Sequence, residues 1–161
     1  MSKERALAAK IWVDADACPL AIKEVLYRAA KKRKVLVTFV ANQGLRLPAS
    51  EFLQSILVTT GLNVADQKIV SLVQPGDLVV TADIPLAADV VAQQATGLSP
   101  RGELFTVENI GERVAVRNLL DDLRGEGQIT GGPSGLTAQD KQAFANQLDR
   151  WLTRNHSNTD G

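Results

Sequence analysis

The chain has 161 residues, 45% of them apolar and 22% charged, which is the composition of one soluble globular domain. Its 18 basic and 18 acidic side chains leave a formal net charge of zero, so the basic excess of a general nucleic-acid-binding protein is absent, and any such contact must come from a local patch. A single cysteine excludes an internal disulfide and fits the reducing cytoplasm, residues 1–10 lack the pattern of a secretory signal, and no apolar run approaches the roughly 18 residues that would span a membrane.

The first half of the chain predicts strands and helices in alternation. Ile11-Trp12-Val13 is a short apolar run that predicts a buried strand ending at Asp14. Pro19 predicts the start of a helix, because the first turn does not need its missing N–H, and the basic run 31–34 suits the end of that helix. The other predicted elements of this half are a strand at 35–40, a loop at 42–50 and a strand at 56–59.

The second half repeats the alternation. Asp66 is predicted to begin a helix with an apolar face, which Pro75-Gly76 ends. Residues 78–81 predict a buried strand, and Pro85 predicts the start of a helix that runs to about Gln94. The later predicted elements are an amphipathic helix at 106–124, a flexible glycine-rich loop at 125–135, and a last helix from the start signal Thr137-x-x-Asp140 to about Arg154.

Strands that alternate with helices predict a three-layer α/β fold, with a mainly parallel sheet and helices on both faces. We expect one domain over residues 10–154, an N-terminal extension over 1–9 and a disordered tail over 155–161. Ligands of such sheets bind outside the carboxyl ends of the strands, so candidate functional residues are sought there.

Four aspartates lie near that edge of the predicted sheet. Asp14 and Asp16 follow the first strand directly, and Asp83 follows the strand at 78–81. Asp66 shares a helix face with apolar neighbours, so its carboxylate leans toward the buried side. Crowded carboxylates repel one another, and Mg²⁺ or Mn²⁺, which prefer oxygen ligands, would relieve the repulsion. We therefore expect Asp14, Asp66 and Asp83 to lie within about 10 Å of one another, around one or two metal ions that activate water for attack on a phosphate ester.

The same four aspartates have a second interpretation. Asp is a favoured N-cap residue, and each of the four lies near a predicted helix start. The prediction of a metal site therefore depends on the group and not on any single member.

Two other residues have a structural interpretation. Asp77 enters its strand instead of leaving it, so it is predicted to be a turn residue at the opposite edge of the sheet. Cys18 is predicted at a helix N-terminus, where the helix dipole lowers the pKa of a thiol. A nucleophilic thiol needs a base, however, and the only histidine, His156, is in the predicted tail. Cys18 is therefore interpreted as a small, partly buried residue.

Candidate substrate contacts are Arg101, Asn42 and Lys23. Arg101 follows a possible strand, from which it can pair with a carboxylate or hold a phosphate. Asn42 follows the second predicted strand, and Lys23 lies on the first helix with other basic residues that either contact a phosphate backbone or form a solvated face. The segment Thr130-Gly-Gly-Pro133 lacks the Gly-Lys-Ser/Thr of a phosphate-binding loop and is interpreted as a flexible connection.

Six short motifs span most of the chain. They are Asp14-Ala-Asp16-Ala-Cys18-Pro19, Ala65-Asp66-Gln-Lys-Ile69, the segment 76–87, Pro100-Arg101-Gly102-Glu103, Thr130-Gly-Gly-Pro133 and Phe144-Ala145-Asn146. Together, over residues 10–152, they resemble the YaiI/YqxD family of uncharacterised bacterial proteins, which is similar to the PIN-like nuclease superfamily.

That resemblance implies a PIN-like fold in which acidic residues hold Mg²⁺ or Mn²⁺ at the carboxyl edge of a parallel sheet. Asp14, Asp66 and Asp83 match the acidic positions of the superfamily, and Asp16 is a fourth candidate. A further acid often lies on an early helix, and Glu24 and Glu51 are the candidates here. The implied function is a metal-dependent nuclease acting on RNA or on another phosphoester.

Two alternatives belong to other classes. Asp14-Ala-Asp16 also resembles the nucleophile and general acid of haloacid-dehalogenase-type phosphatases, although Ala41-Asn42 stands where those enzymes have Ser or Thr. The domain could instead bind RNA or a nucleotide through a metal without cleaving it. Aromatic residues make up only 4% of the chain, which does not favour a dedicated single-strand binder. Metal-dependent cleavage of oligonucleotides distinguishes these possibilities.

Overall fold

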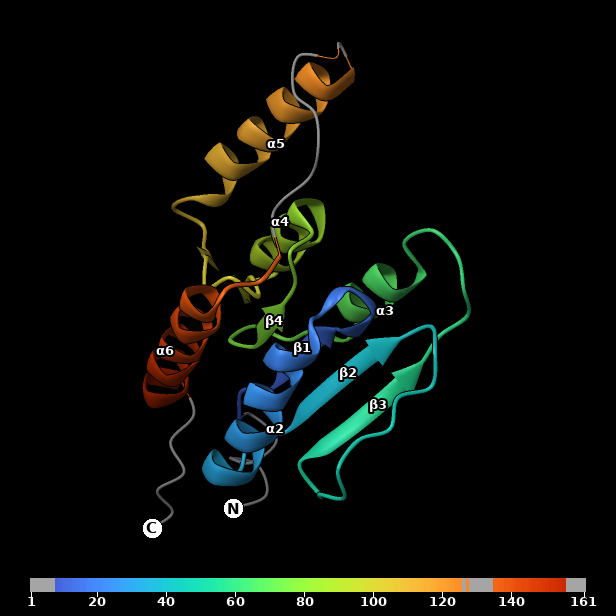
Figure 1. Cartoon of the computed structure of the whole chain (residues 1–161), viewed down its shortest axis with the longest axis vertical. Helices are drawn as coiled ribbons and strands as arrows, with labels where there is room; N and C mark the ends of the chain where they lie inside the picture. The colour runs from blue at the N-terminus through green and yellow to red at the C-terminus, as the bar shows by residue number, and fades with distance from the viewer. Residues whose placement is uncertain (1–7, 126, 128–134, 156–161) are drawn as a thin grey trace.

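The computed structural model describes residues 8–125, 127 and 135–155 (Figure 1). The predicted N-terminal extension, flexible loop and disordered tail therefore fall largely outside the described residues. The elements are β1 (Ile11–Asp14), the 3-10 turn η1 (Ala15–Ala17), α2 (Leu20–Arg33), β2 (Val37–Ala41), β3 (Leu53–Leu57), α3 (Val64–Leu72), β4 (Leu78–Val80), α4 (Ile84–Ala92), β5 (Thr96–Leu98), β6 (Leu104–Phe105), α5 (Ile110–Gly125) and α6 (Ala138–Asn155).

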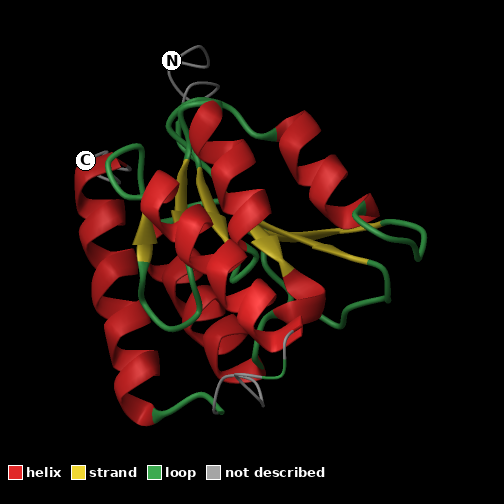
Figure 2. Cartoon of the chain, turned by 90° about the horizontal axis from the view of Figure 1, so that it is seen from above, coloured by secondary structure: helices red, strands yellow, loops and turns green. Residues whose placement is uncertain are grey.

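The strands form one sheet in the order β3-β2-β1-β4-β5-β6. The first five strands of that order are parallel, and β6 pairs with β5 in the antiparallel direction. Figure 2 shows the sheet enclosed by helices. The predicted three-layer α/β fold is confirmed.

Side-chain alternation along β1 divides the core between the two faces of the sheet. Ile11 and Val13 point to one face, where α2 and α6 cover them with apolar residues that include Ile22 and Phe144. Trp12 points to the opposite face, which α3 and α4 cover. β1 is the central strand that supplies apolar residues to both layers, which is why its sequence reads as a continuous apolar run.

Several element boundaries differ from the prediction by about two residues, and two differ by three or more. The third strand was expected at 56–59 and is observed as β3, where Leu53 pairs with Val37. β3 is an edge strand with exposed Gln54 and Ser55, so an apolar run does not mark its start. The helix expected from residue 106 begins at Ile110.

The late start of α5 has a local cause. The Asn109 side chain accepts a hydrogen bond from the backbone N–H of Thr106 (2.9 Å) and donates one to the carbonyl of Leu104 (2.7 Å). These bonds satisfy the backbone in a turn conformation, which competes with the helix.

The start signal predicted for the last helix is confirmed at α6. The Thr137 hydroxyl accepts a hydrogen bond from the backbone N–H of Asp140, and the Asp140 carboxylate accepts one from the N–H of Thr137, both at 3.0 Å. Gly102, in the turn between β5 and β6, has φ +91° and lies so close to α6 that a Cβ atom would be 2.6 Å from Cβ of Ala143. A glycine at this position therefore allows α6 to pack against the sheet.

Asp77 anchors the amino edge of the sheet. The residue is only 2% exposed. It accepts hydrogen bonds from the backbone N–H of Lys10 (3.0 Å), the indole N–H of Trp12 (2.9 Å) and the backbone N–H of Gln74 (3.0 Å). The prediction of a turn residue at this edge is confirmed, and the same side chain also ties the turn to β1.

In the part of the chain that the structure describes, no helix has both the length and the apolar character to cross a membrane.

We predict that Asp77→Ala lowers the free energy of unfolding by about 3 kcal/mol, because it leaves buried donors without an acceptor. Urea denaturation followed by circular dichroism measures this. The control is Asp122→Ala on α5, an exposed position where a change of less than about 0.5 kcal/mol is expected. Equal stability of the two variants would contradict the anchoring role.

Candidate metal centre

The candidate site lies between the carboxyl ends of β1 and β4. From β1 the sheet grows outward to β3 on one side, and the chain then crosses back to β4 and continues outward to β6. This reversal of strand order makes the carboxyl ends of β1 and β4 a topological switch point, which is where ligands of open α/β sheets bind. Asp14 ends β1, and the register that pairs Val13 with Val80 brings Asp14 beside Thr81.

Thr81 links two of the predicted acidic residues. Its hydroxyl donates a hydrogen bond to Oδ2 of Asp14 (2.9 Å) and accepts one from the backbone N–H of Asp83 (3.0 Å). Thr81 is buried and therefore cannot exchange these bonds freely for water. The sequence pattern predicted no role for Thr81 beyond that of a strand residue. Its position at a strand end, two residues before an aspartate, was the available signal.

Asp83 caps α4. Its Oδ1 accepts a hydrogen bond from the backbone N–H of Leu86 (3.0 Å). The capping interpretation is therefore confirmed for this residue. Capping uses Oδ1, and the same carboxyl group also interacts with Asp66 from the neighbouring helix.

Asp66 is not a cap. The N-cap of α3 is Asn63, and Asp66 is the third residue of the helix, so its carboxyl group faces the other acids. Burial raises its pKa to about 6, and the charges of Asp83 and Asp14, a hydrogen bond with the Asp83 side chain and the charge of Asp89 add to the rise. Asp89, on α4, is a contributor that the sequence analysis missed.

Asp14 experiences the same crowding. Burial raises the pKa of Asp14, the hydrogen bond from Thr81 opposes the rise, and the charges of Asp83 and Asp16 add to it. The structure therefore brings Asp14, Asp66 and Asp83 into one electrostatically coupled group, to which Asp16 adds a further charge. We call these four residues the acidic cluster.

The donor set of the acidic cluster fits a hard divalent cation, since every donor is a carboxylate oxygen. Among the described residues, no three acidic, histidine or cysteine side chains converge closely enough, as they stand, to hold one ion. Three of the carboxylates each accept a hydrogen bond on one oxygen. Asp14 accepts one from the Thr81 hydroxyl, Asp83 from the N–H of Leu86, and Asp16 from the N–H of Asn42 (2.8 Å). The residues therefore fit a hard cation in donor chemistry, whereas their side chains, among the described residues, do not converge on one point.

The predicted substrate contacts fall in different places. Asn42 holds Asp16 through its backbone, and Lys23, on the first turns of α2, is close enough to lower the pKa of Cys18. Arg101 forms an ion pair with Asp140 (2.6 Å), the capping residue of α6, so the structural pairing considered for Arg101 is observed.

The two candidates for a further acidic ligand, Glu24 and Glu51, lie in different parts of the structure. Glu24 is an exposed residue on α2, the helix that follows Asp14 and Asp16 in the chain. Glu51 precedes β3, and because β3 is parallel to its neighbour, Glu51 lies at the amino edge, away from the cluster. Glu51 is therefore not placed to join the site.

Cys18 is buried, and burial raises the pKa of its thiol to about 12; the positive charge of Lys23 lowers the pKa only partly. The lowered pKa expected at a helix N-terminus was wrong, because desolvation outweighs the dipole here. The thiol stays protonated at neutral pH, which confirms its interpretation as a small buried side chain.

Fold and site together define a three-layer α/β protein with clustered aspartates at the carboxyl ends of its central strands. The chain belongs to the YaiI/YqxD family, since residues 12–154 match the family described as "Uncharacterized BCR, YaiI/YqxD family".

Curated relatives agree with this assignment. A UPF0178 protein of Shewanella amazonensis is 57% identical over 145 residues, which cover 90% of this chain and 97% of the relative. UPF0178 proteins of Saccharophagus degradans (56% identical, covering 90% of this chain and 96% of the relative) and Proteus mirabilis (54% identical, covering 88% and 94%) are similarly related. No solved structure matches the chain significantly.

We predict that Asp66→Asn stabilises the metal-free protein at pH 7. The raised pKa means that folding disfavours the ionised carboxylate, so wild-type stability from this group is present at low pH and lost as the pH rises through about 6. Solvent screening of this partly exposed group reduces the expected gain to about 1 kcal/mol. Urea denaturation in EDTA at pH 7 and pH 4.5 measures it.

The difference between Asp66→Asn and wild type should be smaller at pH 4.5 than at pH 7, and it should vanish only below about pH 3.9, where the carboxyl group is protonated in the unfolded chain as well. Asp122→Asn, an exposed acid on α5, controls for the loss of one negative charge. A variant that is less stable than wild type at pH 7 would mean that Asp66 has a favourable structural partner.

Proposed function

We propose that the chain is a PIN-like, divalent-metal-dependent phosphodiesterase that cleaves RNA. Asp14, Asp66 and Asp83 would hold Mg²⁺ or Mn²⁺, with Asp16 as a fourth ligand. The observation that carries the proposal is the coupling of three carboxyl groups from separate elements near the carboxyl ends of β1 and β4.

The acidic cluster is costly for the fold alone. Asp14 and Asp66 both have raised pKa values, and each receives unfavourable charge from the others. Structural carboxylates usually have the opposite arrangement, with basic partners and lowered pKa values. Acids that lie close together with raised pKa values, as in the acidic cluster, are instead typical of functional sites, including sites that bind a cation.

The surrounding residues orient the proposed ligands. Thr81 fixes one oxygen of Asp14, the start of α4 fixes one oxygen of Asp83, and the backbone of Asn42 fixes Asp16. Hydrogen bonds of this kind commonly orient metal ligands. When bound, the metal would lower the pKa of a water molecule and stabilise negative charge on the phosphate.

Covalent catalysis by the only cysteine is disfavoured by its chemistry. The Cys18 thiol is buried with a pKa of about 12, so it supplies no thiolate at neutral pH. Water is therefore the nucleophile that suits this site.

We predict that Mn²⁺ at a hundredfold excess over its dissociation constant stabilises the wild type by about 2.7 kcal/mol. Asp14→Asn should lose most of that gain and at least about 100-fold of any RNA cleavage, because it removes a ligand charge. In EDTA the variant should be as stable as the wild type or more stable, since the amide oxygen can still accept the bond from Thr81. Thermal melts and cleavage of mixed RNA and DNA oligonucleotides measure these effects.

Asp122→Asn is the matched control and should keep the metal shift. Asp83→Ala should lose both the metal shift and about 1 kcal/mol in EDTA, because it also removes the cap of α4. No metal shift in the wild type would refute the metal site. A metal shift without cleavage of any oligonucleotide favours the binding alternative, and hydrolysis of small phosphomonoesters alone favours the phosphatase alternative.

A further inference from the structure

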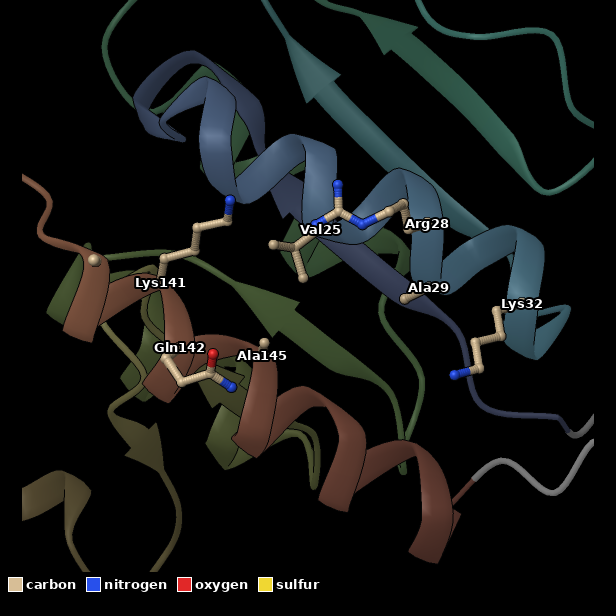
Figure 3. A pocket seen from close by; sticks show the side chains of 8 residues that line it. Val25, Arg28, Ala29, Lys32, Lys141, Gln142 and Ala145 are labelled. Atoms are coloured by element: carbon tan, nitrogen blue, oxygen red, sulfur yellow. The ribbon is translucent and has the colours of Figure 1, made fainter.

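A groove of about 660 Å³ lies between α2 and α6, on the face of the sheet that these two helices cover (Figure 3). Its size falls within the range of about 300–1,000 Å³ that is usual for ligand sites. Its lining residues are Val25, Arg28, Ala29, Lys32, Ala138, Lys141, Gln142 and Ala145.

Small residues keep the groove open. Ala29 on α2 and Ala138 and Ala145 on α6 have no long side chains to fill the space between the two helices. At the far end, Arg33 of α2 bonds to Asp149 of α6 (2.9 Å), which holds the helices together there. The groove is thus bounded at one end and lined by apolar methyl groups.

The groove carries unbalanced positive charge. Arg28, Lys32 and Lys141 line it, and none of their side chains forms a hydrogen bond or an ion pair within the described parts of the chain. Figure 3 shows their side chains around the same groove.

Nearby acids do not neutralise this charge. Asp149 is paired with Arg33, and Asp140 is paired with Arg101. Glu24 lies one helical turn before Arg28, is exposed and does not line the groove. Three like charges around an apolar floor favour an anion with both charged and apolar parts.

α2 joins the groove to the acidic cluster. The helix begins four residues after Asp16, with Lys23 on its first turns. At about 1.5 Å per residue, Arg28 and Lys32 lie roughly 8 and 14 Å farther along the helix axis than Lys23. The groove therefore runs along the α2 face that carries Arg28 and Lys32, and the N-terminus of the same helix follows Asp14 and Asp16 in the chain.

We propose that the α2–α6 groove binds the phosphate backbone of a nucleic-acid strand. Arg28, Lys32 and Lys141 contact phosphates, the alanine-lined floor contacts sugars, and the amide of Gln142 is available for polar contacts. The choice of a nucleic acid over an acidic peptide rests on the proposed function, whereas the need for a polyanion rests on the charges of the groove. The chain has zero net charge, so this groove provides the local patch that nucleic-acid binding requires.

The test is fluorescence anisotropy with a labelled single-stranded RNA of about 12 nucleotides, in EDTA, over a range of salt concentrations. The triple variant Arg28→Gln, Lys32→Gln and Lys141→Gln should bind at least about tenfold more weakly, and the salt slope should fall by about 2. The matched control removes the same charge from Arg117, Arg124 and Arg150, which do not line the groove, and should change affinity by less than about twofold. Each single variant is measured as well, in case the triple variant does not fold.

The outcomes separate this proposal from the proposed function. Equal weakening by the groove and control variants, or no RNA binding by the wild type at low salt, overturns the groove proposal even if the protein cleaves RNA. Selective weakening by the groove variants supports it even if no oligonucleotide is cleaved with Mn²⁺, in which case the proposed catalytic activity fails and the groove remains.

Discussion

The parallel pairing of β1 with β4 is the contact on which the rest of the arrangement depends. These two strands are far apart in the sequence, and their pairing places the end of β1 beside Thr81. One buried hydroxyl can then bond to Asp14 while accepting the N–H of Asp83. At the opposite end of the same strands, Asp77 accepts bonds from Lys10 and Trp12. Both edges of the central strand pair are thus held by a polar side chain, but with opposite electrostatic outcomes.

At the amino edge, a buried carboxylate is surrounded by donors. Asp77 has three of them, which is the normal way to satisfy a buried charge. At the carboxyl edge, the carboxyl groups of Asp14 and Asp66 face other acids, and both have raised pKa values. The hydrogen bonds of Asp77 therefore indicate a structural role. The crowding of Asp14 and Asp66 is not explained by a structural role and is typical of a functional site.

Capping and metal binding are compatible at such an edge. Helices that follow parallel strands begin at the carboxyl edge, so N-cap residues and ligands occupy the same region. Asp83 shows the overlap directly, because Oδ1 caps α4 while the side chain also interacts with Asp66. α2 begins at this edge too and carries basic residues away from it along the groove it shares with α6. The net charge of the chain is zero, but its charges are separated in space, with acidic residues at the carboxyl edge and basic residues along the groove.

The sequence alone determined the features that depend on neighbouring residues. The apolar runs of β1 and β4, Pro19 before α2, and the reciprocal bonds of Thr137 and Asp140 all follow from short-range patterns. Strand–helix alternation also indicated that Asp14 and Asp83 would lie at the carboxyl edge, since this follows from chain direction in a parallel sheet. These patterns give the fold class and the edge at which to look.

Only the tertiary structure decided the features that depend on distant residues. The start of β3 is set by pairing with β2 and not by an apolar run, and the pKa of Cys18 is set by burial that outweighs the helix dipole. The role of Thr81 depends on strand register, which brings it beside Asp14, 67 residues earlier in the chain. The groove depends on the packing of α2 against α6, which are still farther apart in the sequence. Burial, strand register and helix packing are properties of long-range contacts, and a local pattern of residues carries no information about which distant partner will fill the space beside it.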